Sequence, residues 1–144
     1  MAKPSNTSIT AYDKSLQLLS YKNYSSFELR KKLLQFNFID QQISEAIQKC
    51  IDLKLLNDDE TMKYYIENCQ VEKKWGYRKI VSKLQEKNIP ADQIKFFMKE
   101  YYRRDLEPDI KELLLKEKEE KLSDTMDIYK KKGILARFLN QRGF

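Results

Sequence analysis

Two stretches of the chain hold side chains that could do chemistry. The first is the acidic run Asp58-Asp59-Glu60, whose carboxylates could serve acid–base catalysis or bind Mg²⁺. Acidic residues that open a helix more often cap its N-terminus and offset its dipole, and we interpret this run in that way. The sequence has no histidine, and its three glycines are isolated, so it offers neither a histidine base nor a glycine-rich phosphate loop. We therefore expect a protein that is not an enzyme and that uses no cofactor or metal.

The second stretch surrounds Trp75, the one tryptophan of the chain. Lys73, Lys74, Arg78 and Lys79 flank it, and a ring among cations could stack on a nucleic-acid base while the cations meet phosphates. Aromatic residues at helical spacing more often pack in a core, and we favour that interpretation for the tyrosines at positions 64, 65, 77, 101 and 102. At Trp75 both alternatives stay open.

The net charge of +6 is unevenly distributed along the chain. Residues 71–104 carry 10 basic and 4 acidic side chains, residues 105–124 carry 4 and 8, and residues 125–144 carry 5 and 1. Two basic stretches on either side of an acidic one suit a polyanion or an acidic protein groove as a partner. The same charges are equally typical of a solvated surface on lysine-rich helices.

The cysteines and the apolar segments favour a cytoplasmic protein without membrane contact. Cys50 and Cys69 form no disulfide framework, and we expect both to be reduced on helix faces. No segment approaches the roughly 18–20 apolar residues of a membrane span. The first residues lack the apolar core of a secretory signal, and we expect residues 1–9 to be flexible.

The composition predicts an all-α fold. The chain has three glycines and three prolines, and it shows no sustained apolar–polar alternation between turn signals. A repeat emerges when Phe38, Ile89 and Phe144 are aligned, at separations of 51 and 55 residues. In each copy two aliphatic residues four apart precede an Asn or Gly that can close the helix, and then the aligned residue. The aliphatic pairs are Leu29 and Leu33, Ile80 and Leu84, and Leu135 and Leu139, and the closing residues are Asn37, Asn88 and Gly143.

Each copy reads as part of a three-helix unit. Ser25 with Glu28 makes a capping box before the second helix of the first unit, and Gly76 stands at the matching position of the second. We predict a tandem array with repeats at 10–56, 57–106 and 107–144, the last of them lacking its third helix. The apolar residues near the end of the chain should then be less covered than their counterparts, namely Leu135, Phe138, Leu139 and Phe144.

Four motifs in order resemble the RecX family, small bacterial modulators of the recombinase RecA. They are the Ser-x-x-Glu-Leu box at 25–29, LLNDD at 55–59, WGYRKIVSKLQEKNI at 75–89 and RFLNQRGF at 137–144. The resemblance covers about residues 11–144. Three features depart from it. Asn37 and Asn88 stand where the family commonly has Gly, and Thr61-Met62 follows the acidic run where the family usually has Phe-Ala. Family members also usually continue past Arg-Gly-Phe with another short helix. Asn tolerates the left-handed conformation, so the turns should survive.

The resemblance implies an elongated, curved array of three-helix repeats that lies along the groove of the RecA–DNA filament. Members of the family restrain the recombinase, ATPase and coprotease activities of RecA, and several bind DNA directly. A monomer is expected, with the RecA filament as partner and with single- or double-stranded DNA bound directly or through RecA. Helical repeats make extended surfaces that suit such a role. Filament capping and groove bridging both remain open as mechanisms.

The predicted contacts with the filament or DNA combine positive charge with position in the repeat. They are Arg30, Lys31 and Lys32 in the first repeat, Lys73, Lys74, Trp75, Arg78 and Lys79 in the second, and Lys130, Lys131, Lys132, Arg137 and Arg142 in the third. Arg142 follows a helix C-terminus, where a cation is favourable anyway, so a structural role is equally compatible with its position. Two alternatives remain: an autonomous basic helical module that binds DNA without a recombinase partner, and a helical scaffold for some other protein.

Overall fold

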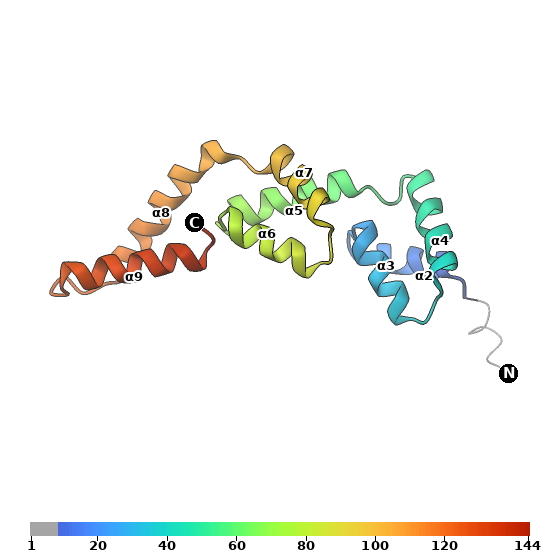
Figure 1. The fold of residues 1–144 in the computed structure, drawn as a ribbon, viewed down its shortest axis with the longest axis horizontal. Coiled ribbons are helices and arrows are strands. Elements are labelled where there is room, and N and C mark those ends of the chain that lie inside the picture. Colours follow the sequence, from blue (N-terminus) through green and yellow to red (C-terminus); the bar gives the residue numbers. More distant parts are fainter. Residues whose placement is uncertain (1–8) are drawn as a thin grey trace. The chain divides into compact units, whose positions relative to one another are not determined.

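The computed structural model describes residues 9–144, and this part of the chain contains helices and turns without a strand (Figure 1). The all-α prediction is therefore confirmed. The predicted flexible segment at 1–9 lies, apart from Ile9, outside the described residues. Within the described part, no helix combines the length and the apolar character that crossing a bilayer requires.

Eight α-helices and one short 3₁₀ helix follow one another along the described residues. They are α2 (Ala11–Leu19), α3 (Ser26–Gln35), α4 (Asp40–Asp52), α5 (Asp58–Val71), α6 (Tyr77–Glu86), α7 (Ala91–Tyr101), η1 (Arg104–Leu106), α8 (Glu107–Glu119) and α9 (Ile128–Gln141). Two compact units divide the chain, one ending at Met62 and the other beginning at Lys63, so their boundary falls inside α5. The repeat boundaries at 10–56, 57–106 and 107–144 stay a prediction.

The first unit buries one face of each of α2, α3 and α4. Leu29 and Leu33, four residues apart on α3, are completely buried, and Ile43 and Ile47 face them from α4. Full burial of one such side chain contributes about 1.5–3 kcal/mol to stability. The predicted capping box is confirmed, because Ser25 Oγ accepts the Glu28 N–H at 3.1 Å and the Glu28 carboxylate accepts the Ser25 N–H.

Two helix-capping contacts lie at the start of α5, one made by Asn57 and the other by the first residue of the acidic run, Asp58. Asn57 caps α5 by accepting the Glu60 N–H at 3.2 Å. The Asp58 carboxylate instead reaches α3, where it accepts the Ser26 N–H at 2.5 Å and also the Ser26 hydroxyl proton. Asp58 therefore satisfies the N-terminus of a neighbouring helix, where a negative charge is favourable. Among the described residues, no group of acidic or cysteine side chains is arranged to hold a metal ion.

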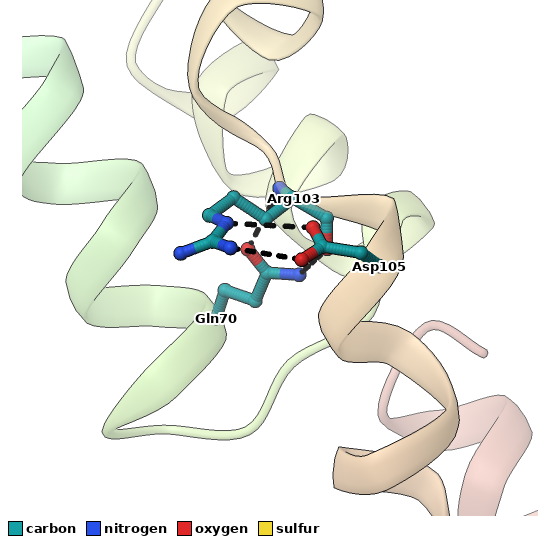
Figure 2. Close-up of polar contacts among 3 residues, drawn as sticks. All are labelled: Gln70, Arg103 and Asp105. Atoms are coloured by element: carbon teal, nitrogen blue, oxygen red, sulfur yellow. Dashed lines mark hydrogen bonds and ion pairs between the residues drawn. The ribbon is translucent and has the colours of Figure 1, made fainter.

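In the second unit, a buried glutamine fixes the turn that follows α7. Gln70 lies on α5 with 1% of its surface exposed, and its side-chain amide bonds both backbone groups of Arg103 (Figure 2). Its Nε2 donates to the Arg103 carbonyl at 2.6 Å, and its Oε1 accepts the Arg103 N–H at 3.0 Å. The Arg103 guanidinium pairs with Asp105 at 2.8 Å. These bonds hold η1, and with it the start of α8, against α5.

The three predicted helix closures are confirmed. Asn37, Asn88 and Gly143 have φ of 69°, 64° and 94°, all in the left-handed region. In each case the N–H of the following residue donates to the carbonyl five positions earlier, at 3.4, 3.4 and 3.0 Å for Phe38, Ile89 and Phe144. Left-handed residues also follow α4 at Lys54 and α5 at Lys74, with φ of 60° and 55°. A lysine gives no sequence signal for this conformation, so those two closures were not predicted.

The helices α8 and α9 form the most thinly covered part of the second unit. Leu135 and Leu139 are half-buried, whereas their counterparts Leu29, Leu33, Ile80 and Leu84 are completely buried. The expectation of lower coverage is therefore confirmed for this pair. Phe144 is half-buried, as Phe38 is, while Ile89 at the same position of the second copy is buried.

Cys50 and Cys69 yield a prediction about thiol chemistry. Both side chains are free thiols without exposed surface, on the core faces of α4 and α5. Burial raises the pKa of both thiols, so the folded state holds these protons more tightly than the unfolded state does. Alkylation by iodoacetamide should therefore be slow in native buffer and should reach two thiols per chain in denaturant, as followed by mass spectrometry.

The same pKa shift makes stability depend on pH. The stability linked to the two thiol protons is present below the unfolded pKa of about 8.5 and is lost as pH rises through the higher folded value. Rapid iodoacetamide labelling of both thiols in the native protein would contradict their burial, on which the raised pKa values depend.

Candidate functional site

The predicted contact residues of the first unit lie on α3, and one of them serves the fold. Arg30 Nη2 donates to Ser44 Oγ at 3.0 Å, and its Nη1 lies 4.0 Å from an Asp40 carboxylate oxygen, so it joins α3 to α4. Lys31 is exposed and Lys32 is half-buried. Of the three, Lys31 has the cation most open to a partner.

The structure gathers three lysines around Trp75. The ammonium nitrogens of Lys73, Lys79 and Lys83 lie 4.7, 4.8 and 5.9 Å from the centre of the Trp75 ring. We call these four residues the Trp75 platform. The sequence prediction included Lys73, Trp75 and Lys79 but missed Lys83, which lies one helical turn beyond Lys79 on α6. Spacing of four residues on a predicted helix was the signal that could have found it.

The platform has the chemistry of a polyanion site. Each lysine gains about 0.5–1 kcal/mol from an exposed aromatic face. Three ammonium groups around one ring also repel one another, and a bound phosphate or carboxylate relieves that repulsion. The Glu86 carboxylate lies 3.6 Å from Lys83 Nζ and offsets part of the charge at one edge. An unstacked base that lies on the half-buried indole displaces a lysine ammonium from the ring face, and that lysine is then available to a phosphate.

Lys74, although next to Trp75, takes part in the backbone closure of α5. Its φ of 55° allows the Trp75 N–H to donate to the Cys69 carbonyl at 3.0 Å. Cys69 is completely buried, so this bond anchors Trp75 to the core of the second unit. The ring of the platform is therefore carried by a fixed backbone.

Arg78 and Arg142 tie α9 to the segment around the start of α6. Arg78 Nη2 donates to Asn140 Oδ1 at 2.7 Å and to the backbone oxygen of Phe144. Arg142 Nη1 donates to the Lys73 carbonyl at 2.9 Å, and its guanidinium lies 5.3 Å from the Phe138 ring. Contact of these two arginines with a partner stays a prediction, but both guanidinium groups already bond within the chain.

A close approach of two glycine backbones lies beneath these side chains. The Gly76 N–H donates to the Arg142 carbonyl at 2.5 Å, and the Arg78 N–H donates to the Gly143 carbonyl at 3.3 Å. Carbonyls at the C-terminus of α9 thus satisfy N–H groups at the N-terminus of α6, and opposite ends of two helix dipoles meet. A Cβ on Gly76 would lie 2.5 Å from the Gly143 oxygen, and one on Gly143 would lie 2.5 Å from the Lys79 nitrogen. Only glycine at both positions permits this contact.

The remaining predicted contacts lie along α9. Lys130, Lys131 and Lys132 follow its N-cap, Asp127, whose carboxylate accepts the Lys130 N–H at 3.2 Å. Lysines close to a helix N-terminus oppose the helix dipole, typically by about 0.3–1 kcal/mol. Lys130, Lys132 and Arg137 are exposed and Lys131 is half-buried. Their role as contacts stays a prediction.

Known proteins resemble this chain in both sequence and fold. The family model for the first three-helix domain of RecX matches residues 11–50. Regulatory protein RecX of Finegoldia magna is 28% identical to this chain over 93% of this chain and 65% of its own length. Regulatory protein RecX of Haemophilus influenzae PittEE is 33% identical over 58% of this chain and 55% of its own length. The chain thus spans about half to two thirds of the length of these curated relatives. The crystal structure of RecX from Lactobacillus salivarius shares the fold with a TM-score of 0.81, at 24% identity over 93% of this chain and 86% of that one.

The glycine contact yields a prediction with a matched control. Gly76→Ala forces its new Cβ into the backbone of residue 143, and the resulting overpacking should lower the free energy of unfolding by about 1–3 kcal/mol. Gly133→Ala places a Cβ 3.5 Å from Arg137 Nη1 inside α9, an ordinary contact, and should raise stability by about 0.5–1 kcal/mol. Urea unfolding followed by circular dichroism measures both. Equal unfolding midpoints for Gly76→Ala and the wild type would show that the two backbones do not meet.

Proposed function

Because the chain belongs to the RecX family of regulatory proteins, we propose that it binds the RecA–DNA filament along its groove. Bound there, it restrains the recombinase, ATPase and coprotease activities of RecA. The observation that supports this proposal from the chain's own residues is the Trp75 platform. The proposal extends the regulatory role to a stated partner and a stated contact surface.

The charge and rigidity of the platform suit a polyanionic groove. Lys79 and Lys83 lie four residues apart on α6, so both side chains extend from one face of that helix. The Trp75 backbone is anchored to the core through Cys69, so the backbone that carries the ring is held before any partner arrives. A preorganised site loses less conformational entropy on binding than a mobile one. Phosphates or carboxylates of the filament would then meet a fixed cluster of cations.

The contacts of Arg78 determine which variant tests the proposal. Arg78 bonds to α9, so reversing its charge would disturb the fold as well as any interface. Lys79→Glu combined with Lys83→Glu reverses two charges of the platform, and outside the platform it breaks only the Lys83–Glu86 ion pair between partly exposed side chains. Lys111→Glu combined with Lys121→Glu makes the same charge change at exposed positions on and just after α8, and it serves as the control.

We expect the wild-type protein and the control variant to lower the DNA-dependent ATPase rate of RecA. The Lys79→Glu, Lys83→Glu variant should lose this effect, because the negative groups of the filament groove repel the two introduced carboxylates. ATP hydrolysis by RecA on single-stranded DNA, measured against regulator concentration, checks both expectations. If the wild type leaves the rate unchanged at concentrations that coat the DNA, the regulator proposal fails. If the double variant inhibits as well as the wild type does, the platform is not the contact.

A second candidate function is DNA binding without RecA, and the indole ring of the platform favours it. Bases of single-stranded DNA can stack on that ring, whereas duplex bases are already stacked. The chain alone should then bind labelled oligo(dT) in fluorescence anisotropy, with affinity that falls as salt rises. Lys79→Ala combined with Lys83→Ala should reduce the log–log salt slope by about 0.7 for each lost phosphate contact. Tight binding to oligo(dT) together with no effect on RecA would favour this candidate over the regulator.

A further inference from the structure

Arg142 bonds the platform segment, residues 72–76, at two places on either side of Trp75. Its guanidinium donates to the Lys73 carbonyl at 2.9 Å, and its own carbonyl accepts the Gly76 N–H at 2.5 Å. One residue of the α9 C-terminal turn therefore holds both ends of the short stretch that carries the ring. The same turn presses Gly143 against the backbone of Lys79, a second member of the platform.

From this geometry we propose that Arg142 is a positioning residue for the Trp75 platform, and that the C-terminal turn of α9 builds this binding site without contacting the ligand. The inference deepens the proposed function and rests on it, because it assigns the platform to a polyanionic ligand. It also assigns a role to α9 in the second unit, because the platform is complete only when the C-terminal turn of α9 is bonded to the start of α6.

The segment needs external support because its own conformation is unfavourable. Lys74 has φ of 55°, a conformation that costs any residue with a Cβ energy and that persists only when surrounding bonds hold it. Within the second unit, Asn68 and Cys69 supply such bonds to the N–H groups of residues 72, 73 and 75. Arg142 supplies further bonds, to the Lys73 carbonyl and the Gly76 N–H. Removal of the guanidinium leaves the Lys73 carbonyl without this partner, while the Gly76 N–H keeps its bond to the backbone carbonyl of residue 142. The segment around Lys74 can then relax at its Lys73 side.

Coupling between the turn and the ligand follows from this arrangement. If docking of the turn fixes the platform, then a ligand on the platform must stabilise the docked turn by the same factor. A ligand should therefore protect the amide hydrogens of Gly76 and Arg78 from exchange, because their acceptors are carbonyls of the α9 turn.

The only tryptophan of the chain reports on the platform directly. Arg142→Ala should raise the acrylamide quenching of Trp75 in the free protein and should weaken oligo(dT) or filament binding about tenfold, the usual effect of losing a charge-assisted hydrogen bond. Arg142→Lys keeps one donor for the Lys73 carbonyl and should recover part of both effects. Lys111→Ala removes one charge on α8 away from the platform and should match the wild type in both assays.

A double-mutant cycle separates positioning from direct contact. In a Trp75→Ala background, Arg142→Ala should weaken binding little further, because both changes remove the same feature. Additive losses, with the salt slope reduced by about 0.7 in Arg142→Ala, would identify Arg142 as a phosphate contact and overturn the proposal. Unchanged quenching of Trp75 in Arg142→Ala would overturn it as well. Because the quenching is measured without ligand, it tests the positioning role even if the protein binds neither oligo(dT) nor the filament.

Discussion

The second unit of this protein depends on a contact between the C-terminus of α9 and the N-terminus of α6. Carbonyls from the last turn of α9 satisfy N–H groups at the first turn of α6, and the contact requires glycine at both Gly76 and Gly143. The orphaned groups of two helices are thus matched to each other, with no side-chain cap at Gly76. The hydrogen bonds of the Arg78 and Arg142 side chains join the same two helix ends.

Local sequence rules were sufficient to predict how several of the helices begin and end. Asn37, Asn88 and Gly143 were predicted to be left-handed because they follow matching aliphatic pairs, and Ser25 with Glu28 was predicted as a capping box. Lys54 and Lys74 take the same conformation without any such signal. The bonds that accompany it are local, from the Leu55 N–H to the Cys50 carbonyl and from the Trp75 N–H to the Cys69 carbonyl. The sequence also suggested an N-terminal role for the acidic run, but it did not reveal that Asp58 serves α3 across the unit.

The candidate site was predictable only in part, because the charge of a residue does not determine which groups its side chain contacts in the folded protein. Lys73 and Lys79 were chosen for their closeness to Trp75, and both lie at its ring. Lys83 was missed because it lies eight residues from Trp75 in the sequence, although helical spacing brings it to the same ring. Arg78 and Arg142 were chosen on the same charge rule, yet their guanidinium groups bond to α9 and to the segment before α6. Long-range partners of this kind cannot be inferred from neighbours in the sequence.

The recurring left-handed closure allows the repeats to differ in length. Its hydrogen bond spans only five residues, so it is complete before the chain enters the next connection. Segments between helices can therefore lengthen or shorten while these helices still end in the same way. The interval from Ile89 to Phe144 is four residues longer than that from Phe38 to Ile89, yet Asn37, Asn88 and Gly143 close their helices alike. Insertions in the connections are thus the changes that such a chain tolerates best, whereas an insertion within a closure would alter the direction in which the next helix starts.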